Sequence, residues 1–227
     1  MRKKNVYLIP GLICSLLAAL GTFAFLFGNM EPGVRFFLMI LLWILLFCAG
    51  KLFSEKHGAK ETIMKISLFC MFLLYVVFLF SVTLFDPAFG RTGALSFLFA
   101  DQAAMEEYLS NYVNLTPFET ISRYLRAYAL NLVSLRTVLT NLAGNLAALA
   151  PMGLFLPVLS KKCRNFLCFF AVTGITVIFI EGLQLLFMTG SCDIDDLILN
   201  LAGACIVWLI LAIKPVQRTV LRWTGIR

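Results

Sequence analysis

Long stretches without a charged residue are the feature of this chain that most restricts its fold. A helix needs roughly 17 to 25 mostly apolar residues to cross a bilayer. Stretches of this kind are Asn5–Met30, Ile66–Phe85, Thr137–Ser160, Asn165–Cys192 (interrupted only by Glu181) and Leu197–Ile213, and a shorter one is Phe36–Gly50. The chain is 61% hydrophobic with a mean hydropathy of +0.92, which excludes a water-soluble domain. We therefore predict an all-α, polytopic transmembrane helical bundle of about six spans.

The second span along the chain, Phe36–Gly50, has 15 residues and reaches across only if Arg35 and Lys51 extend their stems toward the headgroups. The charge distribution needs it. With six spans, the segments on the side of both termini hold 14 of the 19 Lys and Arg residues. By the positive-inside rule we expect both termini on the cytoplasmic side of the membrane. The net charge of +7 then reflects orientation and not nucleic-acid binding.

About 50 residues separate Phe85 from Thr137, too many for a plain connection and too few for a separate domain. This connecting segment is expected on the extracytoplasmic side. Thr116, Pro117 and Glu119 predict a helix start, with Thr116 as the cap and Glu119 as its capping-box partner. An apolar stripe follows at helical spacing: Phe118, Ile121, Leu125, Tyr128 and Leu132. It indicates an amphipathic helix that lies on the membrane surface or covers the bundle.

The earlier part of the connecting segment, Asp101–Tyr112, is acidic and compatible with a helix. We expect a solvated surface helix there.

Glu181 is the only ionisable side chain between Asn165 and Cys192. A charge in hydrocarbon costs at least a few kcal/mol, which makes an intramembrane carboxylate a candidate functional group. Gln184 follows one turn later, and in the predicted orientation other polar groups approach the same leaflet: Asn141 and Asn145 in the fourth span, Asp193, Asp195, Asp196 and Asn200 around the start of the sixth. We predict that they meet in one site. The alternatives are interhelical hydrogen bonding and, for Asp195 or Asp196, capping of the sixth helix.

The candidate site residues fall into two groups. Glu181, Asp193 and Asp196 are candidates for catalysis. The candidates for substrate binding are Asn141, Asn145, Gln184, Asn200, Arg91, Arg123, Arg126 and Arg136. The four arginines suit a pyrophosphate or carboxylate ligand. The sequence identifies no cofactor, and the seven cysteines and the single histidine form no metal-binding pattern.

Small residues and prolines punctuate the last spans. Gly144 and Gly203 are expected to allow close approach of backbones. Pro151, Gly153 and Pro157 are expected to kink the inner half of the fourth span.

Five motifs occur in an order that resembles the VanZ-like family of bacterial membrane proteins. They are Asn141-Leu-Ala-Gly144-Asn145, Pro151-Met-Gly153-Leu-Phe-Leu-Pro157, Lys161-Lys162-Cys-Arg164, Glu181-Gly-Leu-Gln184 and Asp193-Ile-Asp195-Asp196-Leu-Ile-Leu-Asn200. The resemblance runs from about Ser81 to Ile213, leaving residues 1–80 as further spans and 214–227 as a basic tail. It implies an association with low-level resistance to teicoplanin-type lipoglycopeptides.

Three functions are compatible with these residues. The first is binding or protection at the outer leaflet, with a lipid-linked wall precursor or a lipoglycopeptide as the partner and the bilayer as the environment. The second is an enzyme that modifies such a lipid, with Glu181 as a general base and Asp193, Asp195 and Asp196 able to hold Mg²⁺. The third is a proton-coupled transporter or flippase.

Overall fold

The computed structural model describes residues 7–28, 30–57, 60–85 and 101–226. It is all-helical apart from two strands of two residues each, and six helical segments are long and apolar enough to cross a membrane. Their bounds are Leu8–Phe27, Pro32–Glu55, Lys60–Phe85, Leu135–Leu159, Phe166–Phe187 and Ile194–Ala212. The prediction of a six-span helical membrane protein is confirmed. The chain divides into two compact units, Met1–Leu79 with Ile213–Arg227, and Phe80–Ala212.

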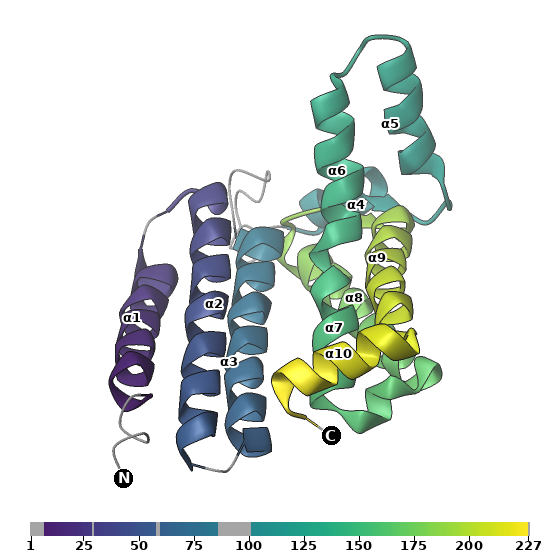
Figure 1. Ribbon diagram of the computed structural model, residues 1–227. Coiled ribbons are helices and arrows are strands. Elements are labelled where there is room, and N and C mark those ends of the chain that lie inside the picture. Colours follow the sequence, from purple (N-terminus) through teal and green to yellow (C-terminus); the bar gives the residue numbers. More distant parts are fainter. Residues whose placement is uncertain (1–6, 29, 58–59, 86–100, 227) are drawn as a thin grey trace. The chain divides into compact units, whose positions relative to one another are not determined.

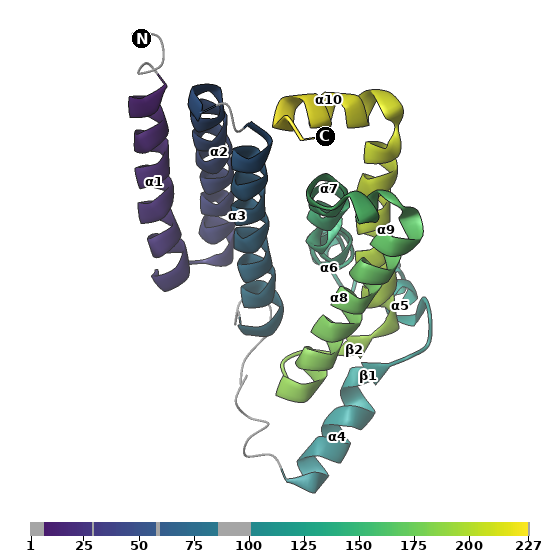
Figure 2. The ribbon, with the colours of Figure 1, turned by 90° about the horizontal axis from the view of Figure 1, so that it is seen from below.

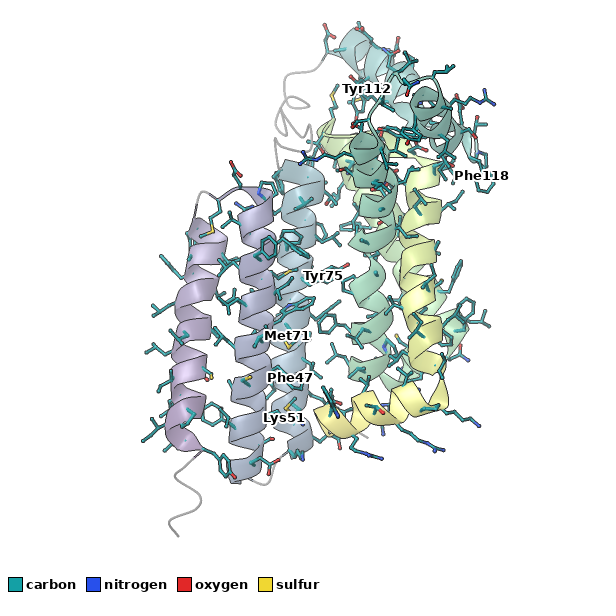
Figure 3. The ribbon with its side chains drawn as sticks, turned by 45° about the horizontal axis from the view of Figure 1, so that its top comes forward. Phe47, Lys51, Met71, Tyr75, Tyr112 and Phe118 are labelled. Carbon is teal, nitrogen blue, oxygen red and sulfur yellow. The ribbon has the colours of Figure 1, made fainter. Side chains whose placement is uncertain are left out.

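The first unit contains three long helices side by side, α1 (Leu8–Phe27), α2 (Pro32–His57) and α3 (Lys60–Phe80) (Figure 1). The short bounds predicted for the second span were wrong. Helix α2 has 26 residues because Arg35 and Lys51 lie within the helix and not at its ends. Lys51 places its ammonium group 5.7 Å from the centre of the Phe47 ring (Figure 3). This unit also includes α10 (Lys214–Thr224), so the basic tail is helical.

The second unit is arranged around α9 (Ile194–Ala212), which contacts α5 (Glu119–Ala129), α6 (Leu135–Ala148), α7 (Ala150–Leu159) and α8 (Phe166–Phe187). A π-helical turn, η2 (Ser81–Phe85), opens the unit, and a 3₁₀ turn, η5 (Lys161–Arg164), joins α7 to α8. The connecting segment supplies α4 (Gln102–Tyr112), strand β1 (Val113–Asn114) and α5. Strand β2 (Cys192–Asp193) immediately precedes α9.

The fourth span is divided into α6 and α7 at Leu149, next to Pro151 as predicted, whereas Pro157 lies inside α7 without a second break. Pro151 has no N–H to donate to the carbonyl four residues earlier, so the helical bonding stops there. Close approach of the backbone of another helix is confirmed at Gly203, and Gly153 shows it as well. A Cβ at Gly203 would lie 1.7 Å from the Leu146 carbonyl oxygen, and one at Gly153 would lie 2.4 Å from the Ala204 carbonyl oxygen. The expectation for Gly144 was wrong, because a Cβ there would meet nothing within 4 Å.

Candidate functional site

The turn between α8 and α9 carries the buried acidic groups of the second unit. Helix α8 ends at Phe187, where Met188 takes a left-handed conformation with φ 53°, and the chain then returns to begin α9. The exposed fractions are 8% for Glu181, 5% for Asp193 and 0% for Asp195. The Asp193 N–H donates to Glu181 Oε2 at 3.4 Å, so the intramembrane glutamate faces this turn. Three carboxylates are therefore buried at one end of the spans.

The Asp193 carboxylate accepts three hydrogen bonds from protein groups. The Thr120 hydroxyl donates to its Oδ2 at 2.6 Å, the Asn114 amide to its Oδ1 at 3.3 Å, and the Asp195 N–H to Oδ1 at 2.9 Å. Two of these donors come from the connecting segment, more than 70 residues earlier in the chain. Buried carboxylates need such donors, since an unsatisfied charge in this environment is very costly. Asp193 thus fastens the connecting segment to the start of α9.

Asp195 caps a helix other than its own. Its two carboxylate oxygens accept from the Phe118 N–H at 2.5 Å and the Ile121 N–H at 3.0 Å, which are free donors in the first turn of α5. Phe118 itself is left-handed, with φ 64°. The prediction that Thr116 caps this helix was wrong, because α5 begins only at Glu119 and a carboxylate from α9 occupies the capping position. The apolar periodicity correctly predicted the helix, but it did not predict that Asp195 caps its first turn.

Strand pairing and a tyrosine complete the attachment of the connecting segment. Strand β1 pairs in parallel with β2, with Val113 opposite Cys192 and Asn114 opposite Asp193 (Figure 2). The Tyr108 hydroxyl of α4 lies within hydrogen-bonding distance of the Gly190 and Gln184 carbonyls. Tyr108 is buried, so the expectation of a fully solvated helix over Asp101–Tyr112 was wrong on that face. The helix itself is present, with Asp101 as its cap.

Gln184 links α8 to the π-helical turn. Its side-chain amide donates to the Thr83 carbonyl at 2.9 Å. A π-helical turn disturbs the regular backbone ladder and frequently occurs at functional sites. The sequence indicated Gln184 as polar and buried, but nothing in its spacing predicted that Thr83 would be the acceptor.

The three asparagines behave differently from one another. The Asn145 amide donates to the Asp196 carboxylate, which joins α6 to the first turn of α9. Asn141 donates to the Thr137 carbonyl, and Asn200 donates to the Asp196 carbonyl, each within its own helix. The predicted gathering on one leaflet therefore comprises two hydrogen-bonded groups, one around Asp193 and one around Asp196. Asn200 bonds to Asp196 only at its backbone carbonyl, and the bond of Asn141 belongs to neither group.

Of the four candidate arginines, the structure describes Arg123, Arg126 and Arg136. Arg123 donates to the Thr120 hydroxyl at 2.8 Å, which places its guanidinium next to the Asp193 group. Arg126 and Arg136 are exposed. Arg91 lies outside the described residues.

The buried carboxylates affect the pKa of the neighbouring Cys192 thiol. Burial raises the pKa of Cys192, and the negative charges of Glu181 and then Asp193 raise it further, because both repel a thiolate. Within residues 7–28, 30–57, 60–85 and 101–226, no three His, Cys, Asp or Glu side chains come close enough together to hold a metal ion. Asp193 and Asp195 instead use their oxygens as acceptors for N–H and O–H groups.

A comparison with protein families matches residues 72–215, well over half of the chain, to VanZ/LLP1. The matched range contains both hydrogen-bonded groups and the whole connecting segment. Searches of curated proteins and of solved structures returned no significant match. The family match agrees with the order of motifs along the sequence, and the chain belongs to the VanZ/LLP1 family.

Proposed function

We propose that this protein acts at the outer leaflet of a bacterial cytoplasmic membrane on a lipid-linked or lipidated headgroup, and that it lowers susceptibility to teicoplanin-type lipoglycopeptides by binding or protection. The observation that carries this proposal is the anchored connecting segment. Two buried carboxylates of the second unit hold the first turn of α5 and the preceding strand in place.

The exposed side of this segment combines apolar and cationic groups. Leu125 and Tyr128 of α5 are exposed, with Arg126 between them in sequence, and Arg136 stands exposed in the first turn of α6. Such a surface suits a ligand that has an acyl chain and an anionic head, because the apolar side chains contact the chain and guanidinium groups bind phosphate or carboxylate. The bilayer supplies the remaining contacts of the acyl chain.

The acidic residues support binding over catalysis. The carboxylates of Asp193 and Asp195 already accept several hydrogen bonds that fix the fold, so they serve the attachment of the segment. Glu181, which accepts from the Asp193 N–H, acts in this proposal by supporting the turn.

Susceptibility testing with matched charge variants examines this proposal. A teicoplanin-sensitive bacterium is compared with the empty vector, the wild-type protein, R126Q/R136Q and the control K161Q/K162Q, at equal expression. Both variants remove two exposed cations, and neither pair takes part in the anchoring bonds. We expect wild type and K161Q/K162Q to raise the inhibitory concentration and R126Q/R136Q to lose the increase. Equal protection by both variants, or none by the wild type, would contradict the proposal.

Mass spectrometry of membrane lipids and wall precursors from the same strains separates binding from chemistry. An unchanged lipid profile together with retention of labelled teicoplanin by membranes that contain the protein supports binding. A new or missing lipid species would favour the enzyme instead.

The proposed orientation rests on the Lys and Arg bias and has a test of its own. Green fluorescent protein fused after Arg227 is expected to fluoresce, as it does in the cytoplasm, whereas alkaline phosphatase at the same position is expected to be inactive. The opposite pair of results would place the termini outside and the connecting segment inside.

A further inference from the structure

The C-terminal helix α10 carries a line of cations. Lys214, Arg218 and Arg222 are spaced four residues apart and therefore share one face. The chain contains no Asp or Glu after Asp196, so no acid within this helix balances them. Ile213 is extended, with ψ 116°, and separates α10 from the apolar span that precedes it. The helix is thus a distinct element and not a continuation of the span.

The end of α10 is packed against the start of α3 within the first unit. Thr224 and Ile226 are buried, and Gly225 takes a left-handed conformation with φ 68°. A Cβ at Gly225 would lie 3.0 Å from Lys60 Cγ, so the helix end meets the stem of Lys60 at the start of α3. Within this unit α10 runs across the direction of α2 and α3 (Figures 1 and 2). It lies at the end of these helices where Lys51 is found (Figure 3). A helix that crosses membrane spans at their end lies along the membrane surface.

The cations of α10 differ from the lysines around them. Lys60 pairs with Glu55 and Lys65 pairs with Glu61, at 3.4 and 2.8 Å. Lys214, Arg218 and Arg222 are exposed, and among the residues that the structure describes none of them forms an ion pair. Trp223 stands beside Arg222 with 65% of its surface exposed. An exposed tryptophan next to unpaired cations is typical of a helix at the level of lipid headgroups.

We propose that α10 is an interfacial helix that binds the anionic headgroups of the leaflet on the side of the termini. Lys214, Arg218 and Arg222 contact lipid phosphates, and Trp223 enters the boundary between headgroups and acyl chains. The occupant is a lipid surface because the cations lie on a helix that crosses the spans at their end, where lipid headgroups supply anions, and because Glu55 and Glu61 at that end already pair with Lys60 and Lys65. This inference concerns a different element from the connecting segment and uses no antibiotic phenotype.

Lipid selectivity of the intact protein tests the inference. The full chain is reconstituted in vesicles of phosphatidylcholine, and the fraction of spin-labelled phosphatidylglycerol immobilised at the protein is compared with that of spin-labelled phosphatidylcholine. Wild type, R218Q/R222Q and K161Q/K162Q are measured at low and high salt. We expect wild type to immobilise a larger fraction of the anionic lipid than of phosphatidylcholine. In R218Q/R222Q the ratio of these two fractions should be about twofold to fivefold lower. The preference should also shrink at high salt.

The K161Q/K162Q control tests whether the lipid preference depends on the cations of α10 in particular. K161Q/K162Q removes the same charge from exposed positions of η5 and is expected to keep the preference. Equal loss in both variants would show that any cation serves, and no preference in wild type would show that α10 faces something other than lipid. Either result overturns the inference. An acidic protein or nucleic acid as the true partner would appear as wild type without lipid selectivity.

Discussion

Several polar side chains of the first unit bond within their own helix, although Ser67 and Trp43 bond to the neighbouring one, whereas the aspartates at the turn between α8 and α9 bond to a distant segment. In the first unit the hydroxyls of Ser15, Thr22 and Ser54 donate to carbonyls three or four residues earlier in the same helix. At the turn, Asp193 and Asp195 accept from residues more than 70 positions away. The first arrangement hides a polar group within a span, and the second builds a tertiary structure. Burial of a polar residue in a membrane protein therefore does not by itself indicate a site, and long-range donors to a buried carboxylate indicate a tertiary attachment.

The largest loss of stability should come from the contact between α6 and α9 at Gly203. Gly203→Ala would place a methyl group 1.7 Å from the Leu146 carbonyl oxygen, so α6 and α9 would have to separate. We expect a loss of about 3 kcal/mol or more. Unfolding in mixed detergent and dodecyl sulfate micelles measures it. Gly144→Ala is the control, because its methyl group meets nothing within 4 Å and alanine favours the helix; similar losses in both variants would refute the packing described for Gly203.

Asp195→Ala should have the next largest effect. It leaves the Phe118 and Ile121 N–H groups without their acceptor, and each buried unsatisfied donor costs about 1 to 3 kcal/mol. We expect limited proteolysis to cut the connecting segment before the spans unfold. Ser54→Ala is the matched change in the first unit, where the hydroxyl bonds only to the Lys51 carbonyl of its own helix, and should cost less than about 1 kcal/mol.

Thr116→Ala tests which residue caps the first turn of α5. If the cap inferred from the sequence were correct, this variant would destabilise α5 as much as Asp195→Ala does. We expect it to leave the proteolysis pattern of wild type unchanged, because α5 begins at Glu119 and is capped by Asp195.

A smaller effect should be seen in the chemistry of Cys192. Glu181→Gln removes the second cause of its raised pKa, so the pKa falls and more thiolate is present at a given pH. Alkylation of Cys192, followed peptide by peptide, should therefore become faster near pH 8. Cys163 serves as the internal reference, since burial and its neighbour Cys168 raise its pKa and Glu181 does not. An unchanged rate at Cys192 would mean that Glu181 is neutral or turned away.

The smallest expected difference in stability is between variants of Asn141 and Asn145, which lie one turn apart in the same span. Asn145→Ala breaks a bond between α6 and α9 and should cost about 1 kcal/mol, whereas Asn141→Ala breaks one within α6 and should cost less than half of that. Equal losses would remove the distinction between the two positions.

The sequence predicted the spans well because membrane spans are specified locally, by length and apolar composition. The helix at α5 and the break near Pro151 are local features too, and both are present, although Leu132 lies beyond the end of α5 and Pro157 lies inside α7. The second span was predicted too short, because Arg35 and Lys51 were treated as ends although long cationic stems fit within a helix that continues beyond the hydrocarbon.

The candidate site was only partly predictable. Glu181 and the aspartates stood out because charge is rare in this chain, but their partners could not be found from spacing. Asn114, Thr120 and Tyr108 lie in a polar segment where such residues are common, and their contacts depend on how the chain returns to β2. One signal was available: an Asp-rich turn beside a segment of about 50 residues too short to fold alone suggests that the one supports the other.

The most direct test of the account is a cross-link between the two short strands in native membranes. Val113 lies opposite Cys192, so V113C should form a disulfide with the native Cys192 under mild oxidation with copper phenanthroline, detected as a linked peptide. Adding Asp195→Ala should slow its formation, and L115C, just beyond β1, should form little. A V113C that links to Cys192 no faster than L115C would contradict the claim that buried carboxylates hold the connecting segment on the spans.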